Sequence, residues 1–276
     1  MTMALFIAAA GVVAANPMTA QQVINGAAPG AIVKLAPGKY PRLMIRGKRW
    51  VRPVVIDASG AMLTLNIVQS GGIIVRGGTF GDALGKGPDG YAMMVRSSEN
   101  IAIENVALKN SIRGLIIAQS RNVRVTQAKI TGMKIDGINI ASSQKIAVTD
   151  SICSDFDSGD AHPDCVQLWS RPNKGVTQDV LIARNRSIGK MQGFGGFNHV
   201  RNGVDDGGFD RITIKDNYVA GGKWPRGVFL NACRDCTITG NIAETLPGAR
   251  WAVTVAAEDC KNCTVRGNQN GKRPKP

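Results

Sequence analysis

The feature of this sequence that most constrains its fold is a short segment that recurs along nearly the whole chain. Each copy is a turn residue followed by an apolar-x-apolar triplet, at residues 72–75, 100–103, 122–125, 145–148, 179–182, 211–214, 235–238 and 262–265. A second series alternates with the first in steps of 22 to 34 residues and starts at Tyr91, Arg113, Asp136, Asp164, Gln192, Arg226 and Trp251. Repeats of this length with two or three short strands are typical of a solenoid, because each coil buries its apolar side only against its neighbours.

The composition favours strands over helices for these repeats. The chain has 25 Ile and 24 Val but only 12 Leu, together with 33 Gly. β-Branched side chains are stiff and pack well on a pleated sheet, whereas glycine permits tight turns. A helical bundle and a coiled coil are therefore excluded, and a propeller would need a longer repeat of about 40 to 50 residues.

The N-terminal residues 1–20 admit two interpretations. The apolar stretch at residues 4–15 is too short to span a bilayer. Its length and the small residues 13–15 fit the core and cleavage site of a signal peptide, although no Lys or Arg precedes it. Alternatively, it forms a short cap on the end of the domain. The repeats then occupy residues 21–270, and a basic tail follows at residues 271–276.

Two groups of motifs carry a resemblance to a known superfamily. The first is Gly-Ala-Ala-Pro-Gly at residues 26–30 with Leu-Ala-Pro-Gly-Lys-Tyr at 35–40; the second is His-Pro-Asp-Cys-Val-Gln at 162–167 with Gln-Gly-Phe at 192–194. Over residues 20–270 the chain resembles the pectate-lyase-like superfamily. The resemblance implies an all-β, right-handed parallel β-helix of roughly 8–10 coils with a short N-terminal cap. Because this fold also carries hydrolases, epimerases and tailspikes, it does not by itself name a reaction.

The second series of segments places two columns of residues on one face of the solenoid. Apolar pairs such as Ile138 and Ile140 are expected to point inward, which leaves an outward column of Met94, Ile116, Asn139, Gln167, Gly195, Phe229 and Thr254. The column beside it consists only of small residues: Ala92, Gly114, Gly137, Cys165, Gly193, Gly227 and Ala252. Such a strip is either a ligand groove or a surface covered by a loop, and we expect the groove. The predicted substrate-binding residues are Arg113, Asn139, Gln167, Gln192 and Phe229.

Two inserted regions carry the residues best suited to chemistry. Residues 155–164 hold four carboxylates and His162, one of only two histidines in a chain with a net charge of +14. This segment is either an active-site loop, whose carboxylates bind a cation or transfer protons, or a solvated turn with capping aspartates. The second region holds His199, a candidate base or ligand that is otherwise a packed or surface residue, and the adjacent pair Asp205 and Asp206. Neighbours in a strand face opposite sides, so that pair is a weak candidate for acid–base work.

The resemblance also implies a mechanism, β-elimination on a uronate polymer. A proton next to a carboxylate is hard to remove until the carboxylate's charge is neutralised by a cation or an Arg. The expected metal is Ca²⁺, with Asp136, Asp160 and Asp164 as its ligands; the expected catalytic residues are His162, Asp164, His199 and Arg226. Neither a complete lyase signature nor the motif set of a polygalacturonase-type hydrolase is found. The alternatives are a non-catalytic carbohydrate-binding or structural β-helix, and an epimerase or hydrolase on the same fold.

The six cysteines occur at positions that follow the repeats. Two Cys-x-x-Cys motifs lie 27 residues apart, in register with the coils, so Cys233 stacks near Cys260 and Cys236 near Cys263. Adjacent coils are about 4.8 Å apart, which is within reach of a disulfide. We expect disulfides here, with zinc or plain core thiols as alternatives. Cys153 and Cys165 flank the acidic loop and would rigidify it if bonded.

The charge of +14 predicts attraction to a polyanion. We expect that partner to be an acidic polysaccharide. Nucleic acid is not expected, because 5% aromatic residues leave few platforms for stacking bases. We further expect a monomer without a membrane span, secreted or periplasmic in location.

Overall fold

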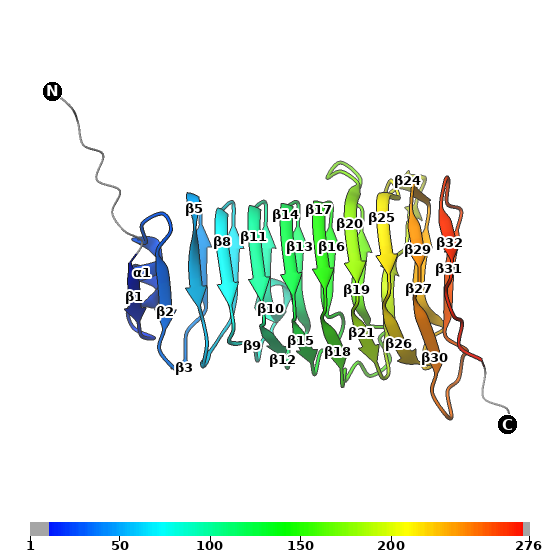
Figure 1. The fold of residues 1–276 in the computed structure, drawn as a ribbon, viewed down its shortest axis with the longest axis horizontal. Helices are drawn as coiled ribbons and strands as arrows, with labels where there is room; N and C mark the ends of the chain where they lie inside the picture. Colours follow the sequence, from blue (N-terminus) through cyan, green and yellow to red (C-terminus); the bar gives the residue numbers. More distant parts are fainter. Residues whose placement is uncertain (1–10, 273–276) are drawn as a thin grey trace.

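The computed structural model describes residues 11–272 and shows an elongated parallel β-solenoid of about 11 turns (Figure 1). Each central turn contributes one strand to each of three parallel sheets, whereas the first turn, with β1 and α1, contributes a strand to one sheet only. The predicted β-helix is confirmed. The turns exceed the expected 8–10 because the first of them, which begins with β1 (Val12–Ala15), lacks the recurring triplet.

Sheet 1 contains the triplets that dominate the sequence. Its strands are β1, β2 (Ile32–Leu35), β5 (Arg49–Asp57), β8 (Gly71–Arg76), β11 (Glu99–Glu104), β14 (Arg121–Thr126), β17 (Gln144–Thr149), β20 (Thr177–Ala183), β25 (Phe209–Lys215), β29 (Thr237–Thr239) and β32 (Thr264–Arg266), with β28 (Cys233–Arg234) paired to β25.

Sheet 2 contains the second series. Its strands are β4 (Leu43–Arg46), β7 (Leu65–Val68), β10 (Tyr91–Arg96), β13 (Arg113–Ala118), β16 (Ile138–Ala141), β19 (Asp164–Trp169), β22 (Gln192–Gly196), β27 (Arg226–Asn231) and β31 (Thr254–Glu258).

Sheet 3 consists of shorter strands. They are β3 (Gly38–Lys39), β6 (Ala61–Leu63), β9 (Thr79–Gly81), β12 (Ala107–Lys109), β15 (Lys129–Thr131), β18 (Ile152–Ser154), β21 (Arg186–Ile188), β26 (Tyr218–Gly221) and β30 (Ile242–Thr245).

The remaining elements lie outside the three sheets. They are helix α1 (Ala20–Asn25), the 3₁₀ turn η1 (Gly87–Gly90) and the hairpin of β23 (Val200–Arg201) and β24 (Val204–Asp205). Helix α1 packs on β1, β2 and β4 at the N-terminal end, and β1 pairs in parallel with β2. Most of the apolar stretch at residues 4–15 lies outside the described residues. No helix among residues 11–272 is long and apolar enough to cross a membrane.

The turns between sheets explain why the repeat begins with a polar residue. Asn100, Asn122 and Asp179 each precede a triplet with φ of 52–56°, a left-handed conformation that Asn and Asp tolerate best after glycine. Inside the coils, the apolar residues stack in register, as Ile101 does on Val123.

Four asparagines are stacked in successive coils toward the C-terminal end. Asn185, Asn217, Asn241 and Asn268 form a chain in which each side-chain amide donates to the next side-chain oxygen at 2.9–3.0 Å. A column of serines at another corner (Ser70, Ser98, Ser120 and Ser143) was not foreseen; each hydroxyl accepts a backbone N–H from the coil before it.

Two disulfides are present among the described residues, Cys153–Cys165 between β18 and β19, and Cys236–Cys263 between the last two coils. Cys233 and Cys260 are stacked as expected but carry free thiols, which corrects the expectation of a bond between them. The reason lies in the side-chain directions: Cys260 Sγ accepts the backbone N–H of Cys233 at 3.3 Å, while Cys233 Sγ turns toward the carbonyl of Arg234.

Candidate functional site

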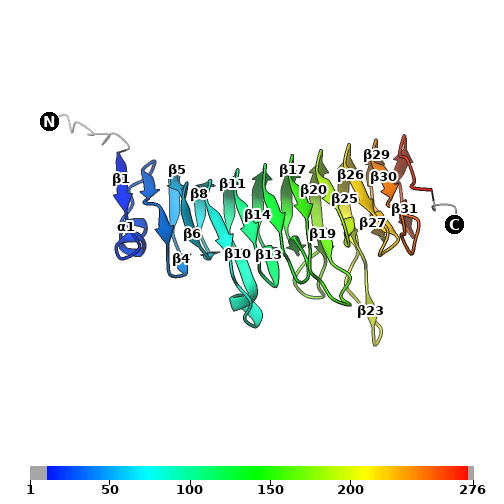
Figure 2. The ribbon, with the colours of Figure 1, turned by 90° about the horizontal axis from the view of Figure 1, so that it is seen from below.

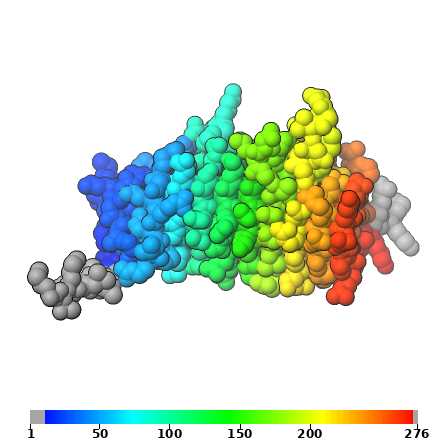
Figure 3. Space-filling view, turned by 90° about the horizontal axis from the view of Figure 1, so that it is seen from above, coloured from blue at the N-terminus to red at the C-terminus, as the bar shows by residue number. Residues whose placement is uncertain are grey.

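The outer face of sheet 2 is the part of the solenoid that the insertions enclose. Residues 82–90 and 155–163 connect sheet 3 to sheet 2 and border one edge of this face; residues 170–176 and 197–208 lead from sheet 2 to sheet 1 and border the other. In Figure 2 the segment before β10 and the β23 hairpin project from the same side of the ribbon. In the space-filling view the surface between these projections is recessed (Figure 3).

A hollow of about 570 Å³ lies on this face, across strands β10, β13 and β16. Its floor includes Met94 and Ile116, and Tyr91 stands at its edge. Three cations, Arg96, Arg171 and Lys174, also line it, whereas its lining contains no carboxylate. Such a surface can hold the apolar face of a sugar ring and pair with carboxylates on that sugar.

A buried polar cluster continues from the hollow toward the C-terminal coils. Asp136 accepts hydrogen bonds from Asn139 Nδ2 at 2.9 Å and from the backbone N–H of Asp164 at 3.0 Å. Arg113 Nε lies 3.6 Å from the carboxylate of Asp136. Asn139 also donates to Gln167 Oε1, at 3.1 Å. The structure thus brings together three predicted substrate-binding residues, Arg113, Asn139 and Gln167, and two predicted metal ligands, Asp136 and Asp164.

Asp164 is the most perturbed acid of this cluster. Its side chain is enclosed, and its Oδ2 has no hydrogen-bond partner. Burial, and then the charge of Asp136, raise the pKa of Asp164 well above its usual value. Burial raises the pKa of Asp136 too, although hydrogen bonds and Arg113 oppose that shift. Because Asp136 has the hydrogen-bond donors and Asp164 does not, Asp164 is the one that retains a proton.

Arg226 lies against the stacked rings of Phe197 and Phe229, whose centres are 4.5 Å apart, beside Asp164. Its guanidinium carbon is 3.8 Å from the ring centre of Phe197 and 4.5 Å from that of Phe229. Burial lowers the pKa of Arg226, and the charge of Asp164 acts on it in the opposite direction. Phe229 and Gln192, both predicted to contact substrate, are buried here, so Arg226 is the more accessible group.

His199 lies beside the same face, on the segment that leads into the β23 hairpin. Its ring stacks on Trp169 with centres 5.4 Å apart and planes 10° apart. Its Nδ1 is buried without a hydrogen-bond partner and lies 3.6 Å from Asp206 Oδ2. Trp169 is fixed in turn by donating to Gln167 Oε1 at 2.7 Å. Trp169 and Asp206 can orient the imidazole for proton transfer, and about a third of the histidine side chain stays exposed, so a substrate can reach it.

The acidic loop is less organised than the sequence suggested. His162 is exposed, with its edge toward Trp224 at 5.8 Å, and Asp157 pairs with Lys134. The predicted calcium ligands do not converge: Asp160 is exposed, whereas Asp136 and Asp164 are buried. Ca²⁺ needs six or more oxygen ligands. Within residues 11–272 no three carboxylates have oxygens that all lie within 4.8 Å of one another. The residues present do not fit a calcium site, and Ca²⁺ binding stays a prediction.

The column of small residues is not a groove, which corrects the expectation. The backbone turns at this corner, so these residues pack under side chains from sheet 3. A Cβ on Gly137 would lie 3.1 Å from Cys153 Sγ, and one on Gly193 would lie 2.6 Å from Val219 Cγ2. The adjacent column from Met94 to Phe229 is in register as predicted, but a shift in β27 and β31 pairs Thr254 with Arg226 instead.

Several residues of the site were missed in the sequence. Tyr91 pairs with Arg113 at the start of neighbouring strands, so it could have been grouped with the polar residues that open the segments of the second series. Trp169 is two positions after Gln167 and therefore shares its face. Arg171 and Lys174 lie in a short insertion that no repeat signal marked. Asp206 and Asp205 were considered only as a pair; in fact Asp205 accepts from Asn198 and Gly207 and forms the base of a turn.

Comparison with known proteins identifies the fold. No protein-family model matches the chain, and no curated protein matches its sequence. The Dettilon tailspike protein superposes with a TM-score of 0.62 and 13% identity, over 91% of this chain and 57% of the tailspike chain. The Family 28 exopolygalacturonase of Yersinia enterocolitica gives 0.55 and 15%, over 96% and 67%. PfbA, a surface adhesin of Streptococcus pneumoniae, gives 0.50 and 13%, over 93% and 86%.

These likenesses show that the chain has the right-handed parallel β-helix fold. The chain spans less than two thirds of the tailspike, and at 13–15% identity the likeness extends to the fold alone.

Proposed function

We propose that this protein binds a uronate-containing polysaccharide on the outer face of sheet 2 and cleaves it by β-elimination. The observation that carries the proposal is the hollow lined by Arg96, Arg171 and Lys174, with Tyr91, Met94 and Ile116 and no carboxylate. Among the proteins with this fold, one is by description an exopolygalacturonase, whose polymer is built from a uronate. The net charge of +14 favours encounter with such a polyanion.

β-Elimination needs one group to offset the uronate charge and another to remove the adjacent proton. Arg171 and Arg113 are the cations on this face that can pair with the sugar carboxylate. His199 is the base that the geometry favours, because Asp206 faces its Nδ1 and Trp169 holds its ring. His162 is the second candidate, and Arg226 would pair with a carboxylate farther along the chain of sugars.

A second candidate function is binding without cleavage. The burial of Asp136, Asp164, Gln167 and Gln192 favours it, since none of them reaches a polymer on the surface without movement of the loops. The adhesin PfbA has the same fold. Hydrolysis and epimerisation receive less support, because a glycosidase needs two carboxyl groups that flank the scissile bond.

The test is to incubate the protein with a panel of uronate polymers, with and without Ca²⁺, and to follow the absorbance of unsaturated products. We expect product from at least one polymer, and its loss in His199→Gln with binding retained. The control is His162→Gln, which separates the two candidate bases. Binding without product on every polymer would replace cleavage by the adhesin-like function; absence of both would refute the proposal.

The location and partners follow from the same proposal. Two disulfides among the described residues support a compartment outside the cytosol, either periplasmic or extracellular. The partner is the polysaccharide, and we propose that the chain acts as a monomer.

A further inference from the structure

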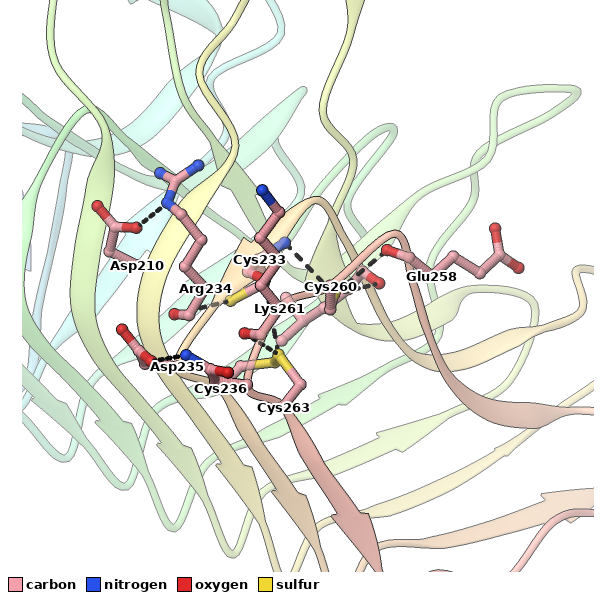
Figure 4. Close-up of a disulfide and its surroundings, with 11 residues drawn as sticks. Asp210, Cys233, Arg234, Asp235, Cys236, Glu258, Cys260, Lys261 and Cys263 are labelled. Carbon is pink, nitrogen blue, oxygen red and sulfur yellow. Dashed lines mark hydrogen bonds and ion pairs between the residues drawn. A yellow bond between two sulfur atoms is a disulfide. The ribbon is translucent and has the colours of Figure 1, made fainter.

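The last two coils present the same Cys-x-x-Cys turn twice. Arg234 pairs with Lys261, and Thr237 pairs with Thr264, so the two turns are stacked in register. Their third positions, Asp235 and Asn262, have φ of 56° and 54°. The turns are joined by a hydrogen bond from Asn262 Nδ2 to Asp235 Oδ1 at 3.2 Å. Four cysteines therefore gather at one corner of the C-terminal end (Figure 4).

The sulfur atoms of this corner are close enough to share one ion. The Sγ atoms of Cys233, Cys236 and Cys263 all lie within 4.8 Å of one another, which no other group of His, Cys, Asp or Glu in residues 11–272 matches. Cys260 Sγ lies outside this close group of three, but it accepts the backbone N–H of Cys233 at 3.3 Å, so a rotation of its side chain would bring it in as a fourth ligand. A disulfide between Cys236 and Cys263 uses only two of the four sulfurs, and it leaves Cys233 and Cys260 as neighbouring thiols.

We propose that in the reduced protein Cys233, Cys236, Cys260 and Cys263 together bind one Zn²⁺ ion that closes the C-terminal coils. Zinc bound by thiolates at about 2.3 Å places tetrahedral sulfurs about 3.8 Å apart, which fits the spread of the Sγ atoms of Cys233, Cys236 and Cys263. Four thiolates give the centre a net negative charge. Arg234, the residue that follows Cys233, is a cation near it, and its guanidinium also pairs with Asp210. The N–H of Cys233 already donates to Cys260 Sγ, as a bound thiolate requires.

The chemistry balances with one reductant. A phosphine reduces the Cys236–Cys263 bond to two thiols and becomes its oxide with oxygen from water. Zn²⁺ then displaces four protons from four thiols. A zinc ion removes such protons by direct coordination.

This site is independent of the polysaccharide face, and its effect would be on the stability of the last coil. Val265 of β32 is 45% exposed, so the final coil buries little apolar surface of its own. A metal ion that joins both turns would hold the final coil against the one before it. Because the ion binds the folded state, its binding free energy adds to the free energy of unfolding.

The experiment is zinc analysis of the full chain after reduction by a phosphine without oxygen, followed by removal of free metal. We expect one zinc per chain, a higher melting temperature with zinc than without, and visible bands of tetrahedral thiolate when Co²⁺ replaces it. Cys260→Ser, which breaks no disulfide, should lose stoichiometric binding while circular dichroism shows intact sheets. The control Cys153→Ala with Cys165→Ala should keep one zinc. Reduced, folded protein that binds no zinc, or equal binding by Cys260→Ser, would overturn the proposal.

Discussion

Replacing Asp164 by Asn should stabilise the protein at neutral pH. The side chain of Asp164 is enclosed, its Oδ2 has no partner, and it lies beside the charge of Asp136. An ionised carboxylate in this position is costly, whereas a neutral amide of the same shape is not.

The sign and size follow from linkage. Burial raises the pKa of Asp164 above the unfolded value of about 3.9, so the folded chain holds a proton that the unfolded chain releases. The stability associated with that proton is fully present below pH of about 4 and is lost as pH rises through the folded pKa. In that window the native protein should lose about 1.4 kcal/mol per pH unit relative to Asp164→Asn.

The assay is urea unfolding followed by far-ultraviolet circular dichroism at one-unit steps from pH 4 to pH 8. We expect the midpoint of Asp164→Asn to exceed that of the native protein at pH 7 and the difference to shrink toward pH 4. Asp157→Asn is the matched control, because Asp157 is exposed and Lys134 lowers its pKa. Its small effect should have the opposite sign and fade as pH falls. A less stable Asp164→Asn at pH 7 would show that Asp164 is ionised and paired with Arg226.

Three further predictions concern the hollow, the Cys153–Cys165 disulfide and the asparagine stack. The double variant Arg171→Gln with Lys174→Gln should weaken binding of a uronate oligomer by about 1–2 kcal/mol, or about 5- to 30-fold in Kd, with a smaller effect at high salt. Titration calorimetry tests this against a control on sheet 3, Lys109→Gln with Lys129→Gln. Equal losses of affinity in the two double variants would show that the hollow is not the binding site. Cys153→Ala with Cys165→Ala opens a loop of 12 residues and should cost about 3 kcal/mol in urea unfolding; an unchanged midpoint would contradict the role of this bond. Asn217→Ala removes a buried amide that bonds Asn185, Asn241 and the carbonyl of Ile182 and should cost at least about 3 kcal/mol. Asn173→Ala, at an exposed position with φ of 62°, should cost only about 1 kcal/mol in the same melts, from backbone strain alone.

The solenoid was predictable because its signals are local and repeated. The left-handed turn residue and the apolar triplet recur in every central coil, and stacking in register follows from equal spacing, as with Ile101 on Val123. The first turn was missed because β1 pairs with β2 without either signal. Thr254 was misplaced because Phe229 pairs with Ala256, two residues farther along, and this displacement of β31 leaves no mark in the sequence. In both places the pairing is decided by contacts between coils.

The site was predictable only where it belongs to a strand. Arg113, Asp136, Asn139, Asp164 and Gln167 were assembled by register alone, since parallel strands carry side chains to neighbouring places. Residues on insertions have no register: Asp206 reaches His199 through a hairpin, and Lys174 reaches the hollow through a turn. The exposure of a site residue is also set by the insertions, which explains why Asn139 and Gln167 are buried although they point outward.

The small-residue column shows how a correct alternation can still assign the wrong face. From Leu115 and Ile117, the period of two places Gly114 outward, and this holds for a straight strand. At the corner between sheets 3 and 2 the backbone bends, so Gly114 packs against Leu108 and a Cβ would lie 2.4 Å from the carbonyl oxygen of Gly137. Small residues are required there by the stacking of adjacent backbones. The groove that the column suggested lies two residues farther along each strand, where Met94 and Ile116 form the floor between the insertions.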